Sequence, residues 1–581
     1  MKSEIKNCQN CKEDFTIEVE DFNFYEKIKV PPPTFCPECR LVRRFVWRNE
    51  RTLYRRTCDL CKKNIVAMHD MSVQFPVYCH QCWHSDEWDA FLYGREYDMS
   101  RSFFDQYKDL LCVVPRLALW QRKVVNSEYS NMTAESKNVY LSVSVVADCE
   151  NIFYSKTVDK STDIIDCSNI KEGQNLYENI EGERNYNSQY LLLSRSCIDS
   201  YYLVDCVNCS NCVLSYNLRN KEFFIRNKQY SKENYFKEIE KLNLKSRISR
   251  EKLLIEFKEI KKRAIYRFSN MVRSIGSTGN NLFNVKNCKS CFDVYDSENL
   301  KYCYRLLSSC KDSMDVNFAM KSELIYEYST GALNDYNVRF SYSAMNFTTN
   351  AEYTDSCFNC DNIFGCIGLK NKEYAIFNKI YSKEEFNKIR KEIIEQMNNI
   401  PYKDKKGRIY RYGEFFPIEF SPWAYNETLA QDFSPLSKEE SEENGYLWKD
   451  SDIKNFQSTI STEDIPDTID EVDEDILKEI LACKHKGNCN HRCSTVFRLT
   501  NYELTFYKKN KIPIPIVCPN CRYYERFVCI PELRLYKRDC MCDKTGHFHG
   551  EEKCIIEFET PYSPERPEII YCEKCYQQEV Y

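Results

Sequence analysis

Histidine is scarce in this sequence and is missing from its whole middle. The chain of 581 residues has seven histidines, and none of them lies between residues 85 and 484. A histidine general base, a catalytic triad or a histidine-bound catalytic metal is therefore excluded from the middle of the chain. Glycine is also rare, with 14 residues, whereas 14% of the residues are aromatic, so the composition is neither collagen-like nor disordered.

Long apolar runs are missing as well. No stretch of about 18 apolar residues occurs, and the first residues carry no apolar leader. We therefore expect a cytoplasmic protein without a membrane partner. In that reducing compartment the 33 cysteines, an odd number, are expected to be metal ligands or small buried side chains, and not disulfides.

Four C-x₂-C pairs near the N-terminus predict two zinc ribbons. Each turn of this kind presents two thiolates to one ion, and two such turns joined by a hairpin-length spacer complete a tetrahedral site. The first predicted site consists of Cys8, Cys11, Cys36 and Cys39, and the second of Cys58, Cys61, Cys79 and Cys82. Four thiolates saturate a zinc ion, so we expect these sites to be structural.

A second copy of this module lies at the C-terminus, at a constant offset of 482 residues. Cys11, Cys36, Cys39 and Cys58 align without a gap on Cys493, Cys518, Cys521 and Cys540. We predict one ribbon there from Cys489, Cys493, Cys518 and Cys521, and another from Cys540, Cys542, Cys572 and Cys575. The expected content is thus about four zinc ions.

The C-terminal ligand set stays open from sequence alone. A C-x-C pair such as Cys540 and Cys542 is awkward for chelating a single ion, so either one ligand is exchanged for another or an additional ion is held. The further donors available in this region are Cys483, His485, His491, His547, His549 and Cys554.

A basic and aromatic segment lies between the two N-terminal ribbons. Its arginines alternate with Phe45, Trp47 and Tyr54, a combination suited to phosphate contacts and base stacking. The candidate nucleic-acid ligands are Arg43, Arg44, Arg48, Arg51, Arg55 and Arg56. The alternative is that these arginines pair with an acidic surface, and the acidic run at residues 463–479 of the same chain is one such surface.

The middle of the chain contains a second duplication. Residues 205–239 and 356–390 repeat at an offset of 151, and in each block a polar turn, an Asn or Asp and a short aliphatic strand recur at short intervals. One such strand cannot bury its apolar face alone, but stacked coils can. We therefore predict a mainly β fold with two right-handed parallel β-solenoids, and ordinary antiparallel sheet is the alternative.

Both blocks are followed by predicted helix caps. Ser231 and Ser382 precede charged segments with apolar residues at helical spacing, so we expect a helix to cover the end of each block. Cysteines also occur inside the blocks at C-x₂-C spacing, where sibling turns carry Ser or Asn; these are Cys206, Cys209, Cys212, Cys288, Cys291, Cys357 and Cys360. We expect a ladder of buried thiols there, with metal or redox use as the alternative.

These features divide the chain into eight segments. In order, they are a tandem zinc-ribbon module (1–90), a connector (91–125), the first β-solenoid block (126–230), a helical cap and linker (231–279), the second β-solenoid block (280–381), a helical cap (382–400), an acidic linker (401–482) and a second tandem zinc-ribbon module (483–581).

Several motifs carry a resemblance to other proteins. They are Tyr-Ser-Lys-Glu-Glu (381–385), Gly-Glu-Phe-Phe-Pro-Ile-Glu-Phe-Ser-Pro-Trp-Ala-Tyr-Asn-Glu-Thr (413–428), His-Ser-Asp-Glu-Trp-Asp (84–89) and the segment 557–572. With them the chain resembles a group of uncharacterised zinc-ribbon and repeat proteins of candidate-phyla bacteria, which are often labelled CoA-transferases. The resemblance implies zinc binding and an intracellular bacterial setting, and it supplies no activity.

The sequence favours a non-enzymatic architectural or binding protein. Our first hypothesis is that the zinc ribbons engage RNA, DNA or a ribonucleoprotein through the basic segment. The second is a protein scaffold whose solenoid faces and acidic linker recruit protein partners. The third is a carbohydrate-active β-solenoid enzyme that uses carboxylates of the second block, namely Asp293, Asp296, Asp312 and Asp315.

Overall fold

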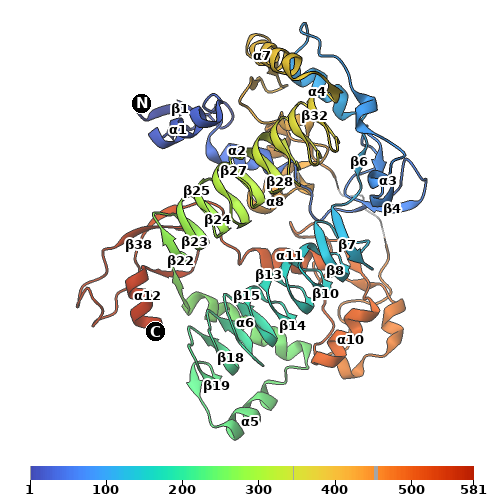
Figure 1. Ribbon diagram of the computed structural model, residues 1–581. Coiled ribbons are helices and arrows are strands. Elements are labelled where there is room, and N and C mark those ends of the chain that lie inside the picture. The colour runs from blue at the N-terminus through green and yellow to red at the C-terminus, as the bar shows by residue number, and fades with distance from the viewer. Residues whose placement is uncertain (1, 345, 451–455) are drawn as a thin grey trace.

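Two large parallel β-sheets form the centre of the molecule (Figure 1). The computed structural model describes residues 2–344, 346–450 and 456–581. Block 1 is a 14-stranded sheet that runs from β7 to β20, and block 2 is a 12-stranded sheet that runs from β22 to β33. None of the helices in the described residues combines the length and the apolar character that a membrane crossing requires.

The strands of both blocks are short. Block 1 contains β7 (Gln121–Val125), β8 (Thr133–Tyr140), β9 (Val143–Val146), β10 (Cys149–Phe153), β11 (Lys156–Asp159), β12 (Thr162–Ile165), β13 (Ser168–Lys171), β14 (Gln174–Tyr177), β15 (Ile180–Glu183), β16 (Tyr186–Leu192), β17 (Tyr201–Val204), β18 (Ser210–Tyr216), β19 (Glu222–Ile225) and β20 (Lys228–Gln229). Block 2 contains β22 (Met271–Ile275), β23 (Gly279–Lys289), β24 (Cys291–Tyr295), β25 (Glu298–Lys301), β26 (Tyr304–Ser308), β27 (Lys311–Met320), β28 (Tyr326–Leu333), β29 (Tyr336–Tyr342), β30 (Thr349–Glu352), β31 (Asp361–Phe364), β32 (Glu373–Ile376) and β33 (Lys379–Ile380).

Strand pairing follows the repeat of the sequence. From β8 to β15 consecutive strands do not pair: β10 pairs in parallel with β8 and β12, and β11 pairs in parallel with β9 and β13. Ile152 lies opposite Ile164, so one sequence repeat separates paired positions. The recurring units are therefore parallel strands, and only the short last strands β20 and β33 pair in antiparallel fashion within their blocks.

The recurring Asn and Asp residues form ladders along the blocks. Asn151 and Asp163 have left-handed backbone, with φ of 58° and 56°, a conformation that Asn and Asp tolerate better than most residues. Asn138 Nδ2 donates to Asn151 Oδ1 at 2.9 Å, and Asn151 Nδ2 donates to Asp163 Oδ1 at 2.9 Å. These residues recur in the sequence because they turn the chain and also link each unit to the next.

The cysteines inside the blocks are buried, as the sequence predicted. All seven of the predicted ladder are at most 2% exposed. The thiol of Cys206 lies 3.5 Å from the carbonyl oxygen of Val204, two residues earlier, and the hydroxyl of Ser188 makes the same contact with Tyr186 at 2.8 Å. Cysteine and serine thus occupy equivalent corners, which explains why they exchange between sibling turns.

Gly279 is required at the start of β23, the second strand of block 2. Its φ is +143°, and a Cβ atom at this position would lie 1.8 Å from the carbonyl oxygen of Cys291 on the adjacent strand. We expect Gly279→Ala to destabilise the chain by about 3 kcal/mol, because overpacking and backbone strain act together. Gly546→Ala is the matched control, since φ is +85° there but nothing lies within 4 Å, and about 1 kcal/mol is expected. Urea unfolding of both variants measures the difference, and equal losses would contradict the steric account.

A helix follows the last strands of each block. Helix α5 (Lys232–Leu242) begins at the N-cap Ser231, and helix α7 (Lys383–Asn399) begins at Ser382 with a capping box. Tyr235 packs on Phe223 at a ring distance of 5.5 Å, and Phe386 packs on Tyr374 at 5.9 Å. The two blocks therefore end in the same way, as their sequence duplication predicts. Helix α6 (Arg247–Arg263) continues from α5 and contacts β17 and β18.

Two small modules flank the blocks. The N-terminal module contains α1 (Val19–Ile28), α2 (Pro37–Phe45) and α3 (His80–His84), with hairpins of β1 (Glu4–Asn7) with β2 (Asp14–Ile17) and β3 (Tyr54–Thr57) with β4 (Asn64–Ala67). The C-terminal module contains α10 (Asn501–Asn510), α11 (Pro519–Phe527) and α12 (Glu573–Val580). In Figure 1, α2 lies against β27 and β28 of block 2, whereas α10 and α11 lie against block 1.

The predicted linker at 401–482 is largely part of the core. Phe415 and Phe416 are fully buried, and Trp423 Nε1 donates to the carbonyl oxygen of Met68 at 2.8 Å. This segment therefore packs between the N-terminal module and block 2, because its aromatic residues need a core to cover them. Farther along, Ile465, Ile469, Val472 and Ile476 join a core cluster with block 1 and α10. Only the acidic side chains of that stretch face outward.

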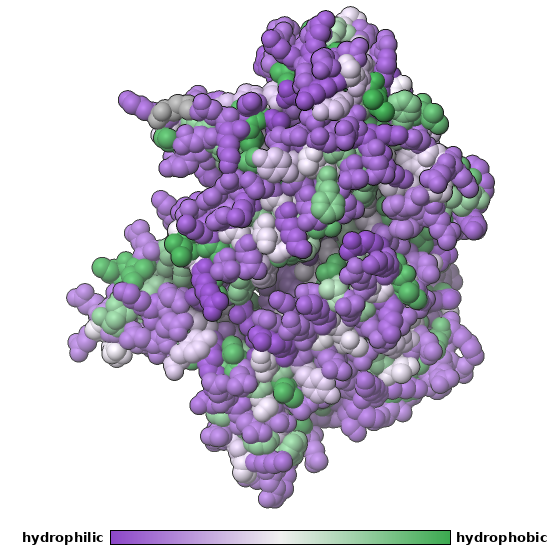
Figure 2. All heavy atoms as spheres, in the orientation of Figure 1, coloured by the Kyte–Doolittle hydropathy of each residue, from purple (hydrophilic) through white to green (hydrophobic). Residues whose placement is uncertain are grey.

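The surface is mostly polar. Figure 2 shows hydrophilic residues over most of the visible face, with hydrophobic residues scattered among them.

Candidate metal centres

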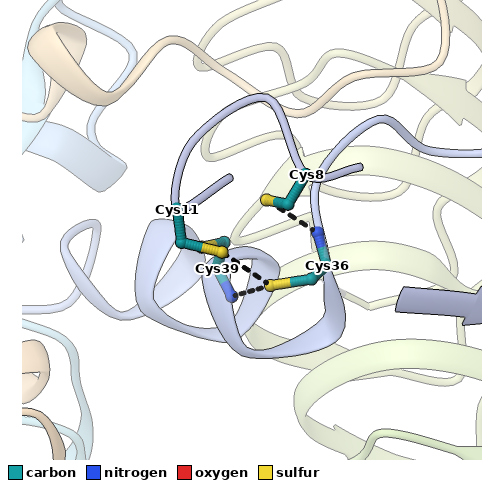
Figure 3. Close-up of side chains that lie close together, drawn as sticks. All are labelled: Cys8, Cys11, Cys36 and Cys39. Carbon is teal, nitrogen blue, oxygen red and sulfur yellow. Dashed lines mark hydrogen bonds between the residues drawn. The ribbon is translucent and has the colours of Figure 1, made fainter. Parts of the chain in front are cut away.

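The first four cysteines gather at the N-terminus of α2. Cys36 is the N-cap of this helix and Cys39 is its third residue, so the helix start presents two thiols to one point. The turn after β1 brings Cys8 and Cys11 to the same point (Figure 3). All four sulfur atoms lie within 4.8 Å of one another, and Cys11 Sγ is 3.7 Å from Cys36 Sγ. Zinc–sulfur bonds of about 2.3 Å place tetrahedral sulfur atoms about 3.8 Å apart, so the tetrad has the size of a zinc site.

The next four cysteines repeat this arrangement at α3. Cys79 is the N-cap of α3 and accepts a hydrogen bond from the backbone N–H of Cys82. Cys58 and Cys61 come from the turn between β3 and β4, and Cys61 Sγ lies 4.0 Å from Cys79 Sγ. The eight cysteines predicted for the N-terminal module are therefore brought together in the two predicted groups.

One backbone contact identifies the first ligand of each group. The backbone N–H of the N-cap cysteine donates to the sulfur of a preceding cysteine in every tetrad. The contacts are Cys36 to Cys8 at 3.2 Å, Cys79 to Cys58 at 3.3 Å, Cys518 to Cys483 at 3.2 Å and Cys572 to Cys540 at 3.2 Å. Cys483 is thus the structural counterpart of Cys8, and Cys540 is the counterpart of Cys58.

The two C-terminal tetrads differ from the predicted sets by one ligand each. The first contains Cys483, Cys493, Cys518 and Cys521, so Cys483 takes the place predicted for Cys489. The second contains Cys540, Cys554, Cys572 and Cys575, so Cys554 takes the place predicted for Cys542. The physical reason is the spacing of the ligands. A helix start fixes the distance between the second two ligands of each tetrad. The first two ligands come from loops of variable length, and only the folded structure brings them together.

Three donors remain beside the second C-terminal tetrad. Cys542 Sγ lies 3.2 Å from His547 Nδ1, and His547 Nε2 lies 3.3 Å from a carboxylate oxygen of Glu579. His549 Nδ1 lies 2.6 Å from the carbonyl oxygen of Glu552. Cys542 and His547 are thus not members of this tetrad, although the Cys542 thiol also contacts the tetrad ligand Cys575.

Backbone N–H groups support a negative charge on the Cys58 thiol. Burial raises the pKa of the Cys58 thiol, but the backbone N–H groups of Cys79, Cys61 and Leu60 outweigh it and hold that pKa at about 7. Hydrogen bonds from the Cys36 and Cys39 thiols lower the pKa of Cys8. The donor sets, the sulfur spacing and this support for negative charge all fit zinc. Four thiolates leave no open position on the ion, so such a site folds the chain and does not activate water.

The basic segment is mostly interior, which corrects its assignment as a nucleic-acid surface. Arg43, Arg44 and Arg48 are fully buried. The guanidinium of Arg43 pairs with Glu327 at 2.7 Å and with Glu414 at 2.7 Å. Burial alone would raise the pKa of the Glu327 carboxyl, but the nearby arginines lower it below its ordinary value. Arginines in such pairs are not available to phosphate groups.

Arg44 and Arg40 complete this interior cluster on α2. Arg40 Nε lies 2.8 Å from a carboxylate oxygen of Asp315, and Arg44 Nη1 lies 3.2 Å from the other. Asp315 is on β27 and Glu327 is on β28, one sequence repeat apart. The acidic partners of these arginines are therefore Asp315 and Glu327 of block 2 together with Glu414, and not the acidic run at residues 463–479.

The C-terminal module makes the same contact with block 1. Arg522 Nε lies 2.8 Å from Asp166 Oδ2, and Arg526 Nη1 lies 3.0 Å from Asp166 Oδ1 and 3.1 Å from Glu178. Arg522 and Arg526 are the residues that align with Arg40 and Arg44 at the offset of 482. The modules are therefore docked crosswise, the N-terminal module on block 2 and the C-terminal module on block 1.

The remaining arginines of the predicted set have different surroundings. Arg51 lies over the ring of Tyr523, with its guanidinium carbon 3.3 Å from the ring centre. Arg55 is exposed and donates to the Tyr129 hydroxyl at 3.1 Å, whereas Arg56 is buried and pairs with Asp59 at 2.9 Å. Only Arg55, and in part Arg51, remain at the surface.

The carboxylates suggested for catalysis are engaged in structural contacts. Asp293 accepts from Asn281 at 2.8 Å and Asp296 accepts from Asn284 at 2.7 Å, as members of the ladders. Asp312 pairs with Lys27 at 2.7 Å, and Asp315 belongs to the arginine cluster. The geometry thus gives these four residues a role in packing the chain.

A half-buried carboxyl group lies between the two blocks. Glu181 of block 1 accepts hydrogen bonds from Asn169 and, at 3.2 Å, from Asn281 of block 2. Burial, and then the neighbouring Asp293, raise the pKa of Glu181 to about 7. A raised carboxyl pKa means that the folded chain holds a proton which the unfolded chain loses near its ordinary pKa of about 4.3.

This proton gives an expected pH dependence. The stabilising effect of protonated Glu181 is present at low pH and is lost as the pH rises toward about 7. The wild-type urea midpoint should therefore fall as the pH rises from about 4.5 to about 7, and Glu181→Gln should reduce that fall. Glu233→Gln, at an exposed helix position, is the control. An unchanged fall in Glu181→Gln would contradict the assignment.

Comparison with known proteins adds no assignment to these sites. Neither the protein-family models nor the curated protein sequences give a match to the chain.

Proposed function

We propose that this protein is a non-enzymatic, zinc-stabilised scaffold. In this proposal each β-block is a β-solenoid, and four zinc ions fold the two modules that clamp the blocks together. The parallel pairing at one-repeat spacing supports stacked coils. The four cysteine tetrads support zinc as the structural metal. A reducing compartment such as the cytoplasm suits a chain whose cysteines are free thiols.

One observation leads us to favour the scaffold over nucleic-acid binding. Arg44, one of the arginines offered as phosphate ligands, and its neighbour Arg40 pair with a carboxylate inside the molecule. Their counterparts Arg526 and Arg522 do the same in the C-terminal module. Their conserved geometry between the two copies is explained by docking. Nucleic-acid binding is the second candidate, and it now depends on Arg55 and the exposed Lys62 and Lys63.

An acidic, ordered strap supplies the surface for a partner. The strap is the segment 463–475, whose apolar side chains are buried while its acidic side chains point outward. The exposed acids are Glu463, Asp464, Asp470, Glu471, Asp473, Glu474 and Asp475. Such a surface suits a basic face of a partner protein and repels nucleic acid.

Crosslinking in the host cell tests the proposal. Wild-type chain, an Arg55→Glu variant and an Asp473→Lys/Glu474→Lys variant would each be crosslinked, purified and treated with nuclease. The scaffold account predicts protein crosslinks that survive nuclease and Arg55→Glu and are lost in the strap variant. Nucleic acid that copurifies with wild type and is lost in Arg55→Glu would overturn it.

A further inference from the structure

A long loop separates the first two ligands of the C-terminal tetrad at α11. In the N-terminal module only Gln9 and Asn10 separate Cys8 from Cys11. In the C-terminal module the residues 484–492 separate Cys483 from Cys493. Since Cys483 is the counterpart of Cys8, this loop is an insertion. It contains His485, Cys489 and His491, which are all good zinc ligands.

The insertion brings these three donors to Cys521. The ligand atoms of His485, Cys489, His491 and Cys521 lie within 4.8 Å of one another. Cys521 Sγ lies 3.8 Å from Cys489 Sγ on this side, and 3.5 Å from Cys518 Sγ and 3.9 Å from Cys483 Sγ on the other. Each of these distances is close to the tetrahedral edge of about 3.8 Å expected around zinc. Cys521 therefore stands at a corner shared by two tetrahedral groups.

The two histidines are oriented as metal ligands. The Nδ1 atoms of His485 and His491 are buried and have no hydrogen-bond partner among the described residues. His485 Nε2 lies 3.5 Å from a carboxylate oxygen of Glu525 on α11, an arrangement that fixes the ring and strengthens the other nitrogen as a ligand. The ring of His491 stacks on Tyr524 at 5.8 Å. Without an ion, two unpartnered nitrogens would be buried at a cost in stability.

We propose that the Cys521 thiolate bridges two zinc ions. One ion is held by Cys483, Cys493, Cys518 and Cys521, and the other by His485, Cys489, His491 and Cys521. This rests on the proposed zinc binding of the tetrads. A thiolate has more than one lone pair, so it can bind both ions, and the second ion offsets negative charge that four thiolates leave around the first.

The tetrad at α2 in the N-terminal module is a single-ion control within the same chain. Cys39, the counterpart of Cys521, accepts a hydrogen bond from Asn10 Nδ2 at 3.2 Å where the second group would lie. The two residues of its short loop, Gln9 and Asn10, are poor zinc ligands. The second site is therefore specific to the insertion.

The second ion would fasten one module to the other. Arg492, at the end of the insertion, donates to the Thr52 hydroxyl of the N-terminal module at 2.8 Å. The carbonyl oxygen of Arg492 accepts from Asn520 Nδ2 at 2.9 Å. His485, Cys489 and His491 would hold the inserted loop against the two ions. Loss of the second ion should therefore break the hydrogen bond between Arg492 and Thr52.

Native mass spectrometry of the full chain tests the second ion. We expect His485→Ala/His491→Ala to bind one zinc ion fewer than wild type. His80→Ala/His84→Ala, a pair of rings 4.5 Å apart on α3, is the control and should keep the wild-type count. An unchanged count in the first variant, or a loss of two or more ions, would overturn the proposal. Wild type with fewer than four ions would instead defeat the proposed zinc binding of the tetrads.

Cadmium-113 NMR tests the bridge itself. In the full chain loaded with this isotope, a shared thiolate should split two resonances through a scalar coupling between the two metal nuclei. That splitting should vanish in His485→Ala/His491→Ala, while the resonance of the remaining tetrad ion stays. A wild-type spectrum in which every resonance is unsplit would overturn the bridging role of Cys521.

Discussion

Chelation of zinc should unfold both ribbon modules and release them from the β-blocks. Structural zinc in small modules is worth on the order of 10–16 kcal/mol per ion, whereas a whole domain is stable by about 5–15 kcal/mol. The starts of α2, α3, α11 and α12 are each tied to a cysteine tetrad. Without the ions, the cysteines at these helix starts are no longer held to the other two cysteines of their tetrads. Loss of helical circular dichroism and cleavage within residues 1–90 and 483–581 by a protease would measure this.

A pair of cysteine variants separates metal binding from burial of a thiol. Cys36→Ser removes a ligand and should lower the zinc count and expose the N-terminal module to protease. Cys366→Ser replaces a buried block thiol that lies 3.5 Å from the carbonyl oxygen of Phe364, a contact that serine makes elsewhere in the blocks. It should leave the zinc count unchanged. Equal effects of the two substitutions would contradict the metal account.

Glu327→Gln should be among the most damaging single substitutions on the chain. It leaves Arg43 and Arg44 buried with much of their charge uncompensated, and breaking a buried ion pair from one side costs about 3–5 kcal/mol. Asp166→Asn should act in the same way on the other module, because Arg522 and Arg526 depend on it. Urea unfolding followed by tyrosine and tryptophan fluorescence gives the change in free energy of unfolding.

An exposed ion pair provides the control for this prediction. Glu233 pairs with Lys237 one helical turn away, with side chains that are 78% and 63% exposed. Glu233→Gln should change the stability by no more than about 0.5 kcal/mol, since water screens such pairs. A Glu327→Gln variant as stable as Glu233→Gln would contradict the crosswise docking of the modules.

Local spacing predicted much of how the cysteines group. The N-terminal tetrads follow from C-x₂-C pairs alone, because a turn and a helix start fix each pair. The C-terminal ligand sets were harder to predict, because the alignment of Cys11 with Cys493 places Asn490, which is not a zinc ligand, opposite Cys8. Cys483 takes that place only because the insertion folds back, as the backbone contact from Cys518 shows. Such a loop closure leaves no signal in the spacing.

The partner of the basic segment could not be read from nearby sequence. Asp315 and Glu327 lie in the other half of the chain, so no local charge pattern links them to Arg40 and Arg44. A signal does exist at long range: Asp166 and Glu178 stand one repeat apart in block 1, as Asp315 and Glu327 do in block 2. Two duplicated arginine pairs and two duplicated acid pairs together indicate docking.

The zinc content of the intact chain is the most direct test of the account. Native mass spectrometry of the full chain under reducing conditions should find at least four zinc ions, one for each cysteine tetrad. Removal of an ion should unfold the module that holds it, and a folded module should keep its ions. A folded, protease-resistant chain that holds fewer than four zinc ions would contradict the central claim.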